Sequence, residues 1–215
     1  MLSKKTLTNG IIVLVFIIVF YLILKEPMET FFSRTNVLSS VDKRKYNIVG
    51  KYEEFTHDDA ANKLARLNRK TIELLRHLRR KYIWGRKGTP EIRERVLYLV
   101  ENYDPDVIRE NAPLGKVNTS YVRNKGDVIA ICLREKRSGE NKFHDDETLQ
   151  FVKLHEITHI FSKVRGHPYK FWKNFKFILQ EAVEAGLYKP IDYAKYPVPY
   201  CGIEITYNPY FDINL

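Results

Sequence analysis

A continuous apolar run near the amino end differs from the rest of the chain. Residues 11–24 read IIVLVFIIVFYLIL without a charge, and residues 7–10 extend the uncharged stretch. A membrane-spanning helix needs about 20 predominantly apolar residues, so we expect residues 7–24 to cross a membrane once, within an anchor of residues 1–25. A cleavable signal peptide is the main alternative, although Lys25, Glu26 and Pro27 stand where small residues would mark a cleavage site. A buried core helix, the other alternative, would need burial on every face.

The charges around this run leave open which side of the membrane holds the rest of the chain. Lys4 and Lys5 precede the run, and a larger positive group follows it: Lys25, Arg34, Lys43, Arg44 and Lys45. Positive residues favour the cytosolic side, so the count slightly favours a cytosolic domain. The glycosylation sequon that begins at Asn118 would matter only on a luminal side. Residues 26–55 show little periodicity, and we expect them to form a tether.

Apolar residues recur at helical spacing in four later segments. The first begins at Thr56 with a capping-box-like start and continues to Gly85; the second begins at Thr89-Pro90-Glu91 and ends near Tyr103. The third follows a cap at Asp145 or Asp146 and carries Leu149, Val152, Ile160 and Phe161, and the fourth spans residues 171–185. We therefore expect four helices.

A β-hairpin is predicted between the second and third helices. Residues 120–123 and 127–134 are rich in β-branched side chains, and Asn124-Lys125-Gly126 between them has turn chemistry. The last thirty or so residues contain several prolines among many tyrosines, and we expect them to be irregular and packed over the domain. The pattern predicts an α+β domain over residues 56–215.

Composition adds a basic surface to this outline. The chain has 215 residues, 44% of them hydrophobic, and 36 Lys and Arg against 26 Asp and Glu give a net charge of +10. These values exclude a disordered chain. Residues 63–81 of the first helix carry Lys63, Arg66, Arg69, Lys70, Arg76, Arg79, Arg80 and Lys81. This face is either simply solvated or a surface for nucleic acid or anionic lipid. Cys132 and Cys201 match no metal-binding spacing, and their pairing is left open.

The candidate chemistry lies in the third helix, which contains His155-Glu156-Ile157-Thr158-His159. Residues four apart share one helical face, so His155 and His159 can bind one metal ion, and Glu156 can activate a water molecule beside it. A catalytic zinc needs a third protein ligand. We expect His167 to supply it, because Gly166 before it lets the chain turn back after the helix. His57, His77 and His144 read as surface histidines, although His144 lies close enough in sequence to the helix start to enter the cleft.

The order of these motifs resembles the WLM zinc metallopeptidases. The resemblance spans residues 114–185 and rests on four segments: VIAICLR from Val128, Thr148-Leu149, the HEITH pentapeptide, and GHPYKFW from Gly166. The related SprT and Spartan-like proteases share the HExxH sequence followed by Gly-His. The resemblance implies a minimal zincin-like fold, zinc ligands at His155, His159 and His167, and Glu156 as the catalytic carboxylate. It also implies a protein substrate, including protein crosslinked to DNA, although the membrane anchor does not suit that role.

The sequence thus predicts a membrane-anchored zinc metalloendopeptidase that hydrolyses peptide bonds with metal-activated water. The oxyanion-stabilising group is open, with Tyr169, Tyr200 and Tyr207 as candidates by residue type. We expect the strand at 127–134 to bind extended substrate at an exposed edge. Two alternatives stay open. One is an inactive, zinc-stabilised scaffold that binds nucleic acid or anionic lipid through residues 63–81, and the other is a zinc hydrolase acting on small amides or esters.

Overall fold

The computed structural model describes residues 13–14, 34–50, 56–111, 119–124, 126–135 and 142–215. The chain divides into two units, Met1–Ser33 and Arg34–Leu215. The expected anchor lies outside the described residues except for Val13 and Leu14, which are helical, and Asn118 of the sequon lies outside them as well. In the part of the chain that is described, no helix has both the length and the apolar character needed to cross a membrane. The anchor therefore stays a prediction.

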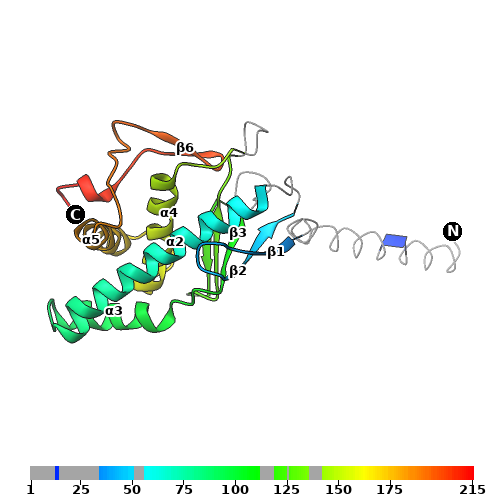
Figure 1. The fold of residues 1–215 in the computed structure, drawn as a ribbon. Coiled ribbons are helices and arrows are strands. Elements are labelled where there is room, and N and C mark those ends of the chain that lie inside the picture. The colour runs from blue at the N-terminus through cyan, green and yellow to red at the C-terminus, as the bar shows by residue number, and fades with distance from the viewer. Residues whose placement is uncertain (1–12, 15–33, 51–55, 112–118, 125, 136–141) are drawn as a thin grey trace, which may run out of the picture. The chain divides into compact units, whose positions relative to one another are not determined.

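The second unit is an α+β domain built on a five-stranded mixed sheet (Figure 1). Its order is β1-β2-β3-β5-β4. The β1–β2 and β4–β5 pairs are antiparallel, whereas β2–β3 and β3–β5 are parallel. The predicted hairpin is confirmed as β4 and β5, and β3 was not predicted. The strands are β1 (Arg34–Leu38), β2 (Lys45–Val49), β3 (Ile108–Asn111), β4 (Tyr121–Arg123) and β5 (Val128–Cys132).

The expected tether is wrong over residues 34–49, which form β1 and β2. Val37 pairs with Tyr46 in their antiparallel register, and Tyr46 and Ile48 are buried in the core. The turn between the strands is held against the helix α2 (His57–Leu78), because the Ser39 hydroxyl donates to Asn62 Oδ1 at 2.8 Å. Two short strands with many polar residues give little periodicity of their own, and their burial against a distant helix is what orders them. The folded domain therefore includes residue 34.

The four predicted helices are confirmed: α2 (His57–Leu78), α3 (Pro90–Asn102), α4 (Asp146–Ser162) and α5 (Tyr169–Glu184). A π-helical segment, η3 (Arg79–Trp84), extends α2 to Gly85. The Asp145 side chain caps α4 by accepting from Thr148 N at 2.8 Å. The expected capping by Thr56 is wrong, because the Thr56 hydroxyl makes no cap and instead accepts from Arg134 Nη1 at 3.0 Å.

Helices cover the sheet and close a single hydrophobic core. Helix α2 packs against β2 and β3, while α4 packs against β4 and β5 and also against α3 and α5 (Figure 1). The fully buried residues of this core include Leu64, Leu74, Leu99, Ile157 and Phe161. Helix α4 therefore lies between the sheet and α5, and both of its ends are held by neighbours.

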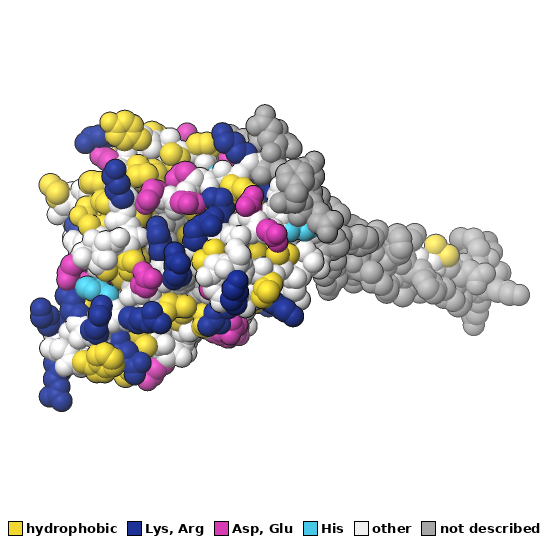
Figure 2. Space-filling view, in the orientation of Figure 1, with side chains coloured by type: hydrophobic (Ala, Val, Ile, Leu, Met, Phe, Trp, Pro, Cys, Tyr) yellow, Lys and Arg dark blue, Asp and Glu magenta, His cyan; other side chains and the backbone are white. Residues whose placement is uncertain are grey.

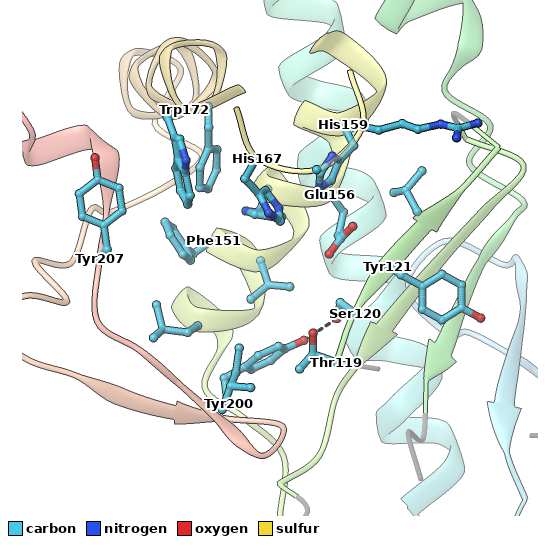
Figure 3. A pocket seen from close by; sticks show the side chains of 18 of the residues that line it. Thr119, Ser120, Tyr121, Phe151, Glu156, His159, His167, Trp172, Tyr200 and Tyr207 are labelled. Carbon is cyan, nitrogen blue, oxygen red and sulfur yellow. Dashed lines mark hydrogen bonds between the residues drawn. The ribbon is translucent and has the colours of Figure 1, made fainter. Parts of the chain in front are cut away.

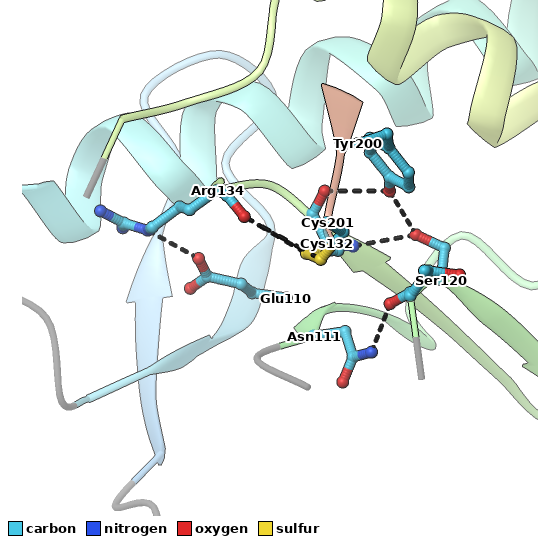
Figure 4. The surroundings of a disulfide bond; sticks show 8 residues. Glu110, Asn111, Ser120, Cys132, Arg134, Tyr200 and Cys201 are labelled. Carbon is cyan, nitrogen blue, oxygen red and sulfur yellow. Dashed lines mark hydrogen bonds and ion pairs between the residues drawn. A yellow bond between two sulfur atoms is a disulfide. The ribbon is translucent and has the colours of Figure 1, made fainter. Parts of the chain in front are cut away.

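The C-terminal segment is more ordered than expected. It contains the hairpin of β6 (Val198–Tyr200) and β7 (Ile203–Ile205), followed by the 3-10 helix η4 (Pro209–Phe211). A disulfide joins Cys132 at the end of β5 to Cys201 in the hairpin turn, with a Cα–Cα distance of 6.3 Å (Figure 4). The Tyr200 hydroxyl also donates to Cys132 O at 3.0 Å. The hairpin is thus fastened to the sheet by a covalent bond and a hydrogen bond.

Candidate metal centre

Three histidine side chains converge beside α4. His155 and His159 lie one turn apart on this helix, and His167 comes from the connection to α5. One ligand atom from each of the three lies within 4.8 Å of the others, and His155 Nε2 and His167 Nε2 are 2.9 Å apart. The structure therefore brings together the three residues that the sequence singled out.

The connection between α4 and α5 gives His167 its position. Lys163 ends α4 with φ of 55° and Gly166 follows with φ of 63°, so the chain reverses through two left-handed residues. Helix α5 then supplies Phe171, whose ring packs 4.9 Å from the ring of His155 and 4.5 Å from that of His159. Gly166 was expected to allow the turn, whereas the left-handed Lys163 had no signal in the sequence.

The three imidazoles fit a zinc ion in both spacing and charge. Nitrogen ligands at about 2.0–2.1 Å from a tetrahedral zinc lie about 3.3 Å from one another; the His155 Nε2–His167 Nε2 distance of 2.9 Å is close to this value, and all three ligand atoms lie within 4.8 Å of one another. Burial and the neighbouring imidazoles hold the pKa of His155 well below its usual range, and burial lowers the pKa of His159 to about 4. Burial also lowers the pKa of His167. At neutral pH the rings are therefore uncharged and can offer lone pairs to a metal ion.

Glu156 lies next to the first of these histidines and is only 5% exposed. Its carboxyl group points into the space between α4 and β4 and lines the cavity (Figure 3). Burial raises its pKa, and the positive charge of Lys153 opposes that rise. Lys153 is itself fully buried, with its Nζ atom 4.9 Å from the centre of the Tyr103 ring. A carboxylate held in this way is placed to accept a proton beside a metal ion.

The histidines and Glu156 line a cavity of about 1010 Å³. Figure 3 shows two sides of it: Thr119, Ser120 and Tyr121 lie on the side toward which Glu156 points, and Phe151, Trp172 and Tyr207 lie on the side of His167. The first side comes from β4 and the residues before it, and the second from α4, α5 and the chain that follows β7. The cavity is large enough to hold several residues of an extended peptide.

The three tyrosine candidates for the oxyanion-stabilising group differ in position. Tyr200 lines the cavity, but its hydroxyl is engaged by Cys132 O and by Ser120 Oγ at 2.6 Å. Tyr207 lines the cavity and its hydroxyl donates to Asp212 Oδ2 at 2.6 Å. Tyr169 does not line it, and its ring is 59% exposed. Of the two that line the cavity, Tyr207 is the better candidate, because it is 38% exposed whereas Tyr200 is buried with two partners on its hydroxyl.

Two other sequence expectations are wrong. The strand at 127–134 is not an edge, because β5 lies between β3 and β4; among the described strands, β4 is the edge beside the cavity. His144 does not enter the cleft. It is buried rather than on the surface, and its ring centre lies 4.7 Å from that of Tyr200.

The basic face of α2 is partly neutralised within the chain. Lys63 pairs with Asp146 at 2.6 Å, and Lys81 pairs with Glu181 at 2.9 Å and Glu184 at 2.5 Å. His77 approaches the same two glutamates, so this second group of potential ligands already holds a cation, the Lys81 ammonium. Figure 2 shows lysine and arginine side chains on the face that α2 crosses, with acidic side chains among them. Exposed positive residues on this face include Arg69, Arg76, Arg79 and Arg80.

The C-terminal hairpin is the part of the site that sequence reasoning missed. It contributes Tyr200, Ile203 and Ile205 to the cavity wall. Its two-residue turn needs positive φ at both positions, which Cys201 (50°) and Gly202 (86°) adopt. Cysteine is not a usual residue for such a turn, so the Cys-Gly pair gave a weak signal. The alternation of Val198, Tyr200, Ile203 and Ile205 is the signal that was available.

Comparisons with known proteins identify relatives without a described activity. No protein-family model matches the chain, and no solved structure matches it. It is 40% identical over 96 residues to an uncharacterised protein of Acanthamoeba polyphaga mimivirus, covering 45% of this chain and 47% of that protein. It is 39% identical over 69 residues to an uncharacterised protein of Invertebrate iridescent virus 6, covering 32% and 38%.

A third similarity is to an uncharacterised protein of Invertebrate iridescent virus 3, with 34% identity over 83 residues, 39% of this chain and 50% of the other. The chain thus spans half or less of the length of these curated relatives. All three similarities are to viral proteins.

Proposed function

We propose that this protein is a zinc-dependent metalloendopeptidase with a minimal zincin-like fold, similar to the WLM metallopeptidases. The observation that carries the proposal is the convergence of three imidazoles at the wall of a cavity, with the buried side chain of Glu156 next to the first of them. His155, His159 and His167 would hold the ion, which would leave its fourth position open toward the cavity.

The chemistry follows from the placement of Glu156. A bound zinc ion supplies Lewis-acid chemistry, polarising a carbonyl oxygen and making water more acidic. The Glu156 carboxylate accepts the proton of the attacking water molecule and donates it to the amine nitrogen of the leaving peptide. The low exposure of Glu156 keeps bulk water away from this proton. The edge strand β4 can hold an extended peptide by adding it as a further strand, which places a peptide carbonyl near the histidines.

Zinc content and proteolysis, measured on three proteins, test the proposal. The parent chain, purified in mild detergent, should bind one zinc ion per chain by mass spectrometry of the metal and should cleave denatured casein. Glu156→Gln should keep its zinc and fold while losing roughly 10²–10⁴-fold in cleavage rate. His155→Ala should lose zinc. Cleavage by Glu156→Gln at the parent rate would contradict the mechanism.

Other residues of the chain provide controls for the histidine assignment. His57→Ala, at the start of α2, should leave zinc content unchanged, because His57 is not among the converging histidines. In a zinc-bound structure all three ligand nitrogens should lie about 2.0–2.1 Å from the ion. If His167 points away from the ion, the ligand set is wrong.

The exposed arginines of α2 support an alternative function, a zinc-stabilised scaffold that binds nucleic acid or anionic lipid. It predicts zinc binding without peptide cleavage, and affinity for a DNA duplex or for phosphatidylserine vesicles that falls steeply with salt. Arg76→Glu together with Arg80→Glu should then abolish binding to DNA or vesicles while the variant keeps its zinc.

The membrane location rests on the sequence of residues 7–24. We propose a single-pass membrane protein, with the domain slightly favoured on the cytosolic side. The full chain should stay in the membrane fraction after washing with carbonate and high salt, and a chain that lacks residues 1–25 should be soluble. Recovery of the full chain in the soluble fraction would remove the anchor.

A further inference from the structure

One side of the cavity is aromatic to an extent that metal binding does not require. The side chains that form it come from α4, α5 and the segment around β7, and they carry no charge. We call this set the aromatic subsite: Phe151, Trp172, Phe175, Ile203, Ile205 and Tyr207.

The aromatic subsite has a buried floor and an open rim. Phe151 and Phe175 form the floor, 5% and 0% exposed, with their ring centres 5.1 Å apart. Trp172 and Tyr207 stand at the rim with ring centres 5.3 Å apart and planes at 80°. Tyr207 is 38% exposed and Ile203 46% exposed. Large apolar side chains left open to solvent in a cavity mark a binding site for apolar groups.

The subsite begins at the metal ligands. The ring centre of Trp172 lies 5.6 Å from that of His167, and the ring centre of Phe175 lies 5.2 Å from that of His155. Glu156 and β4 lie on the other side of the histidines (Figure 3). A polypeptide along β4 with one carbonyl at the histidines would therefore direct a neighbouring side chain toward the aromatic subsite.

We propose that the aromatic subsite selects the cleavage position, by taking a large apolar side chain, such as phenylalanine, tyrosine or leucine, next to the scissile bond. This proposal rests on the proposed peptidase function. Because such side chains are mostly buried in folded proteins, the subsite favours extended or unfolded polypeptide segments as the substrate class.

Mapping of cleavage sites is the first test. The parent chain is allowed to cleave denatured β-casein and the cleaved bonds are mapped. At one position beside the scissile bond, cleavage at large apolar residues should be roughly 10–100-fold more frequent than cleavage at alanine, which is the usual discrimination of an apolar pocket. Trp172→Ala should reduce this preference at least tenfold while keeping zinc. Trp84→Ala is the matched control, because Trp84 is 66% exposed, does not line the cavity and should leave the preference unchanged.

Ile203→Ser is a second variant that keeps the test decisive if Trp172→Ala does not fold. Ile203 stands at the exposed rim, so its loss should weaken the preference without loss of zinc or of the thermal unfolding transition. An equal spread of residue types around the cleaved bonds of the parent chain would overturn the subsite and leave the peptidase function standing.

A binding measurement separates the subsite from catalysis. The chain contains two tryptophans, so Trp84→Phe leaves Trp172 as its single tryptophan reporter. N-acetyl-phenylalanine amide should change the emission of Trp172 with saturation, whereas N-acetyl-alanine amide should not. Saturation by the first probe in a protein that cleaves no casein would reject the peptidase and support an apolar binding site. If neither probe changes the emission, the subsite is refuted.

Discussion

Removal of the disulfide between Cys132 and Cys201 should destabilise the domain by a calculable amount. The bond closes a loop with a sequence separation of 69 residues. Without the bond, the unfolded chain regains the conformational entropy that the crosslink removes. For a loop of about 70 residues this lowers the free energy of unfolding by about 4 kcal/mol at 25 °C. The native hairpin should stay in place, because Tyr200 still donates to Cys132 O and still contacts Ser120 Oγ.

The change is Cys132→Ala with Cys201→Ala, and the assay is urea unfolding followed by circular dichroism in the presence of EDTA. With a slope of about 2–3 kcal/mol/M, the midpoint should fall by roughly 1.5–2 M. A dithiol reductant should lower the midpoint of the parent chain by a similar amount and leave that of the double variant unchanged. A decrease of the midpoint by less than about 0.5 M would refute the loop-entropy reasoning. An effect of the reductant on the double variant would show that the reductant acts on something other than this disulfide.

Three further predictions concern pH, a buried ion pair and a glycine. Folding lowers the pKa values of His155 and His159, so in metal-free protein their contribution to stability is complete above pH 6.5 and falls as the pH drops toward 4. The urea midpoint of the parent chain should therefore decline between these pH values, and that of His159→Asn should decline less. Equal declines would contradict the lowered pKa of His159. Glu110, 1% exposed in its side chain, accepts from Arg134 Nε at 2.8 Å, so Glu110→Gln should cost about 3 kcal/mol in thermal unfolding by removing the negative charge beside a buried guanidinium. A cost like that of an exposed control, Glu94→Gln, would show that the pair contributes little. Gly126→Ala should destabilise the β4–β5 hairpin by about 1–3 kcal/mol, because the φ of Gly126 is 132° and an added Cβ would lie 2.9 Å from the carbonyl oxygen of Asn102 in α3. An unchanged free energy of unfolding would mean that this turn relaxes without cost.

Features that depend on neighbouring residues in sequence could be predicted. The helix starts at Thr89 and at Asp145 or Asp146 follow from the residues preferred at helix caps. The helical repeats and the placement of His155 and His159 on one face follow from the 3.6-residue period. The structure has each of these features. In the same way, the turn residues between β4 and β5 were sufficient for the hairpin.

Features that depend on distant partners could not be predicted. Strand β3 reads Ile-Arg-Glu-Asn, and its Glu110 is buried because it meets Arg134 and accepts from Val49 N, 61 positions away. Strands β1 and β2 are ordered by α2, and the aromatic subsite combines three segments that are far apart in the chain. No local pattern records such pairings, so tertiary contacts override weak local preference.

The covalent loop that the Cys132–Cys201 disulfide closes contains His155, His159 and His167. A break of the chain within this loop therefore leaves both fragments covalently joined. The connection between α4 and α5, with Lys163, Arg165 and His167 exposed, is a natural position for proteolytic nicking. A cut there would place two of the histidines on one fragment and the third on the other, yet the fragments would stay joined through the disulfide. Self-cleavage at this position would therefore leave a single band on a gel run without thiol, and two fragments would appear only after reduction.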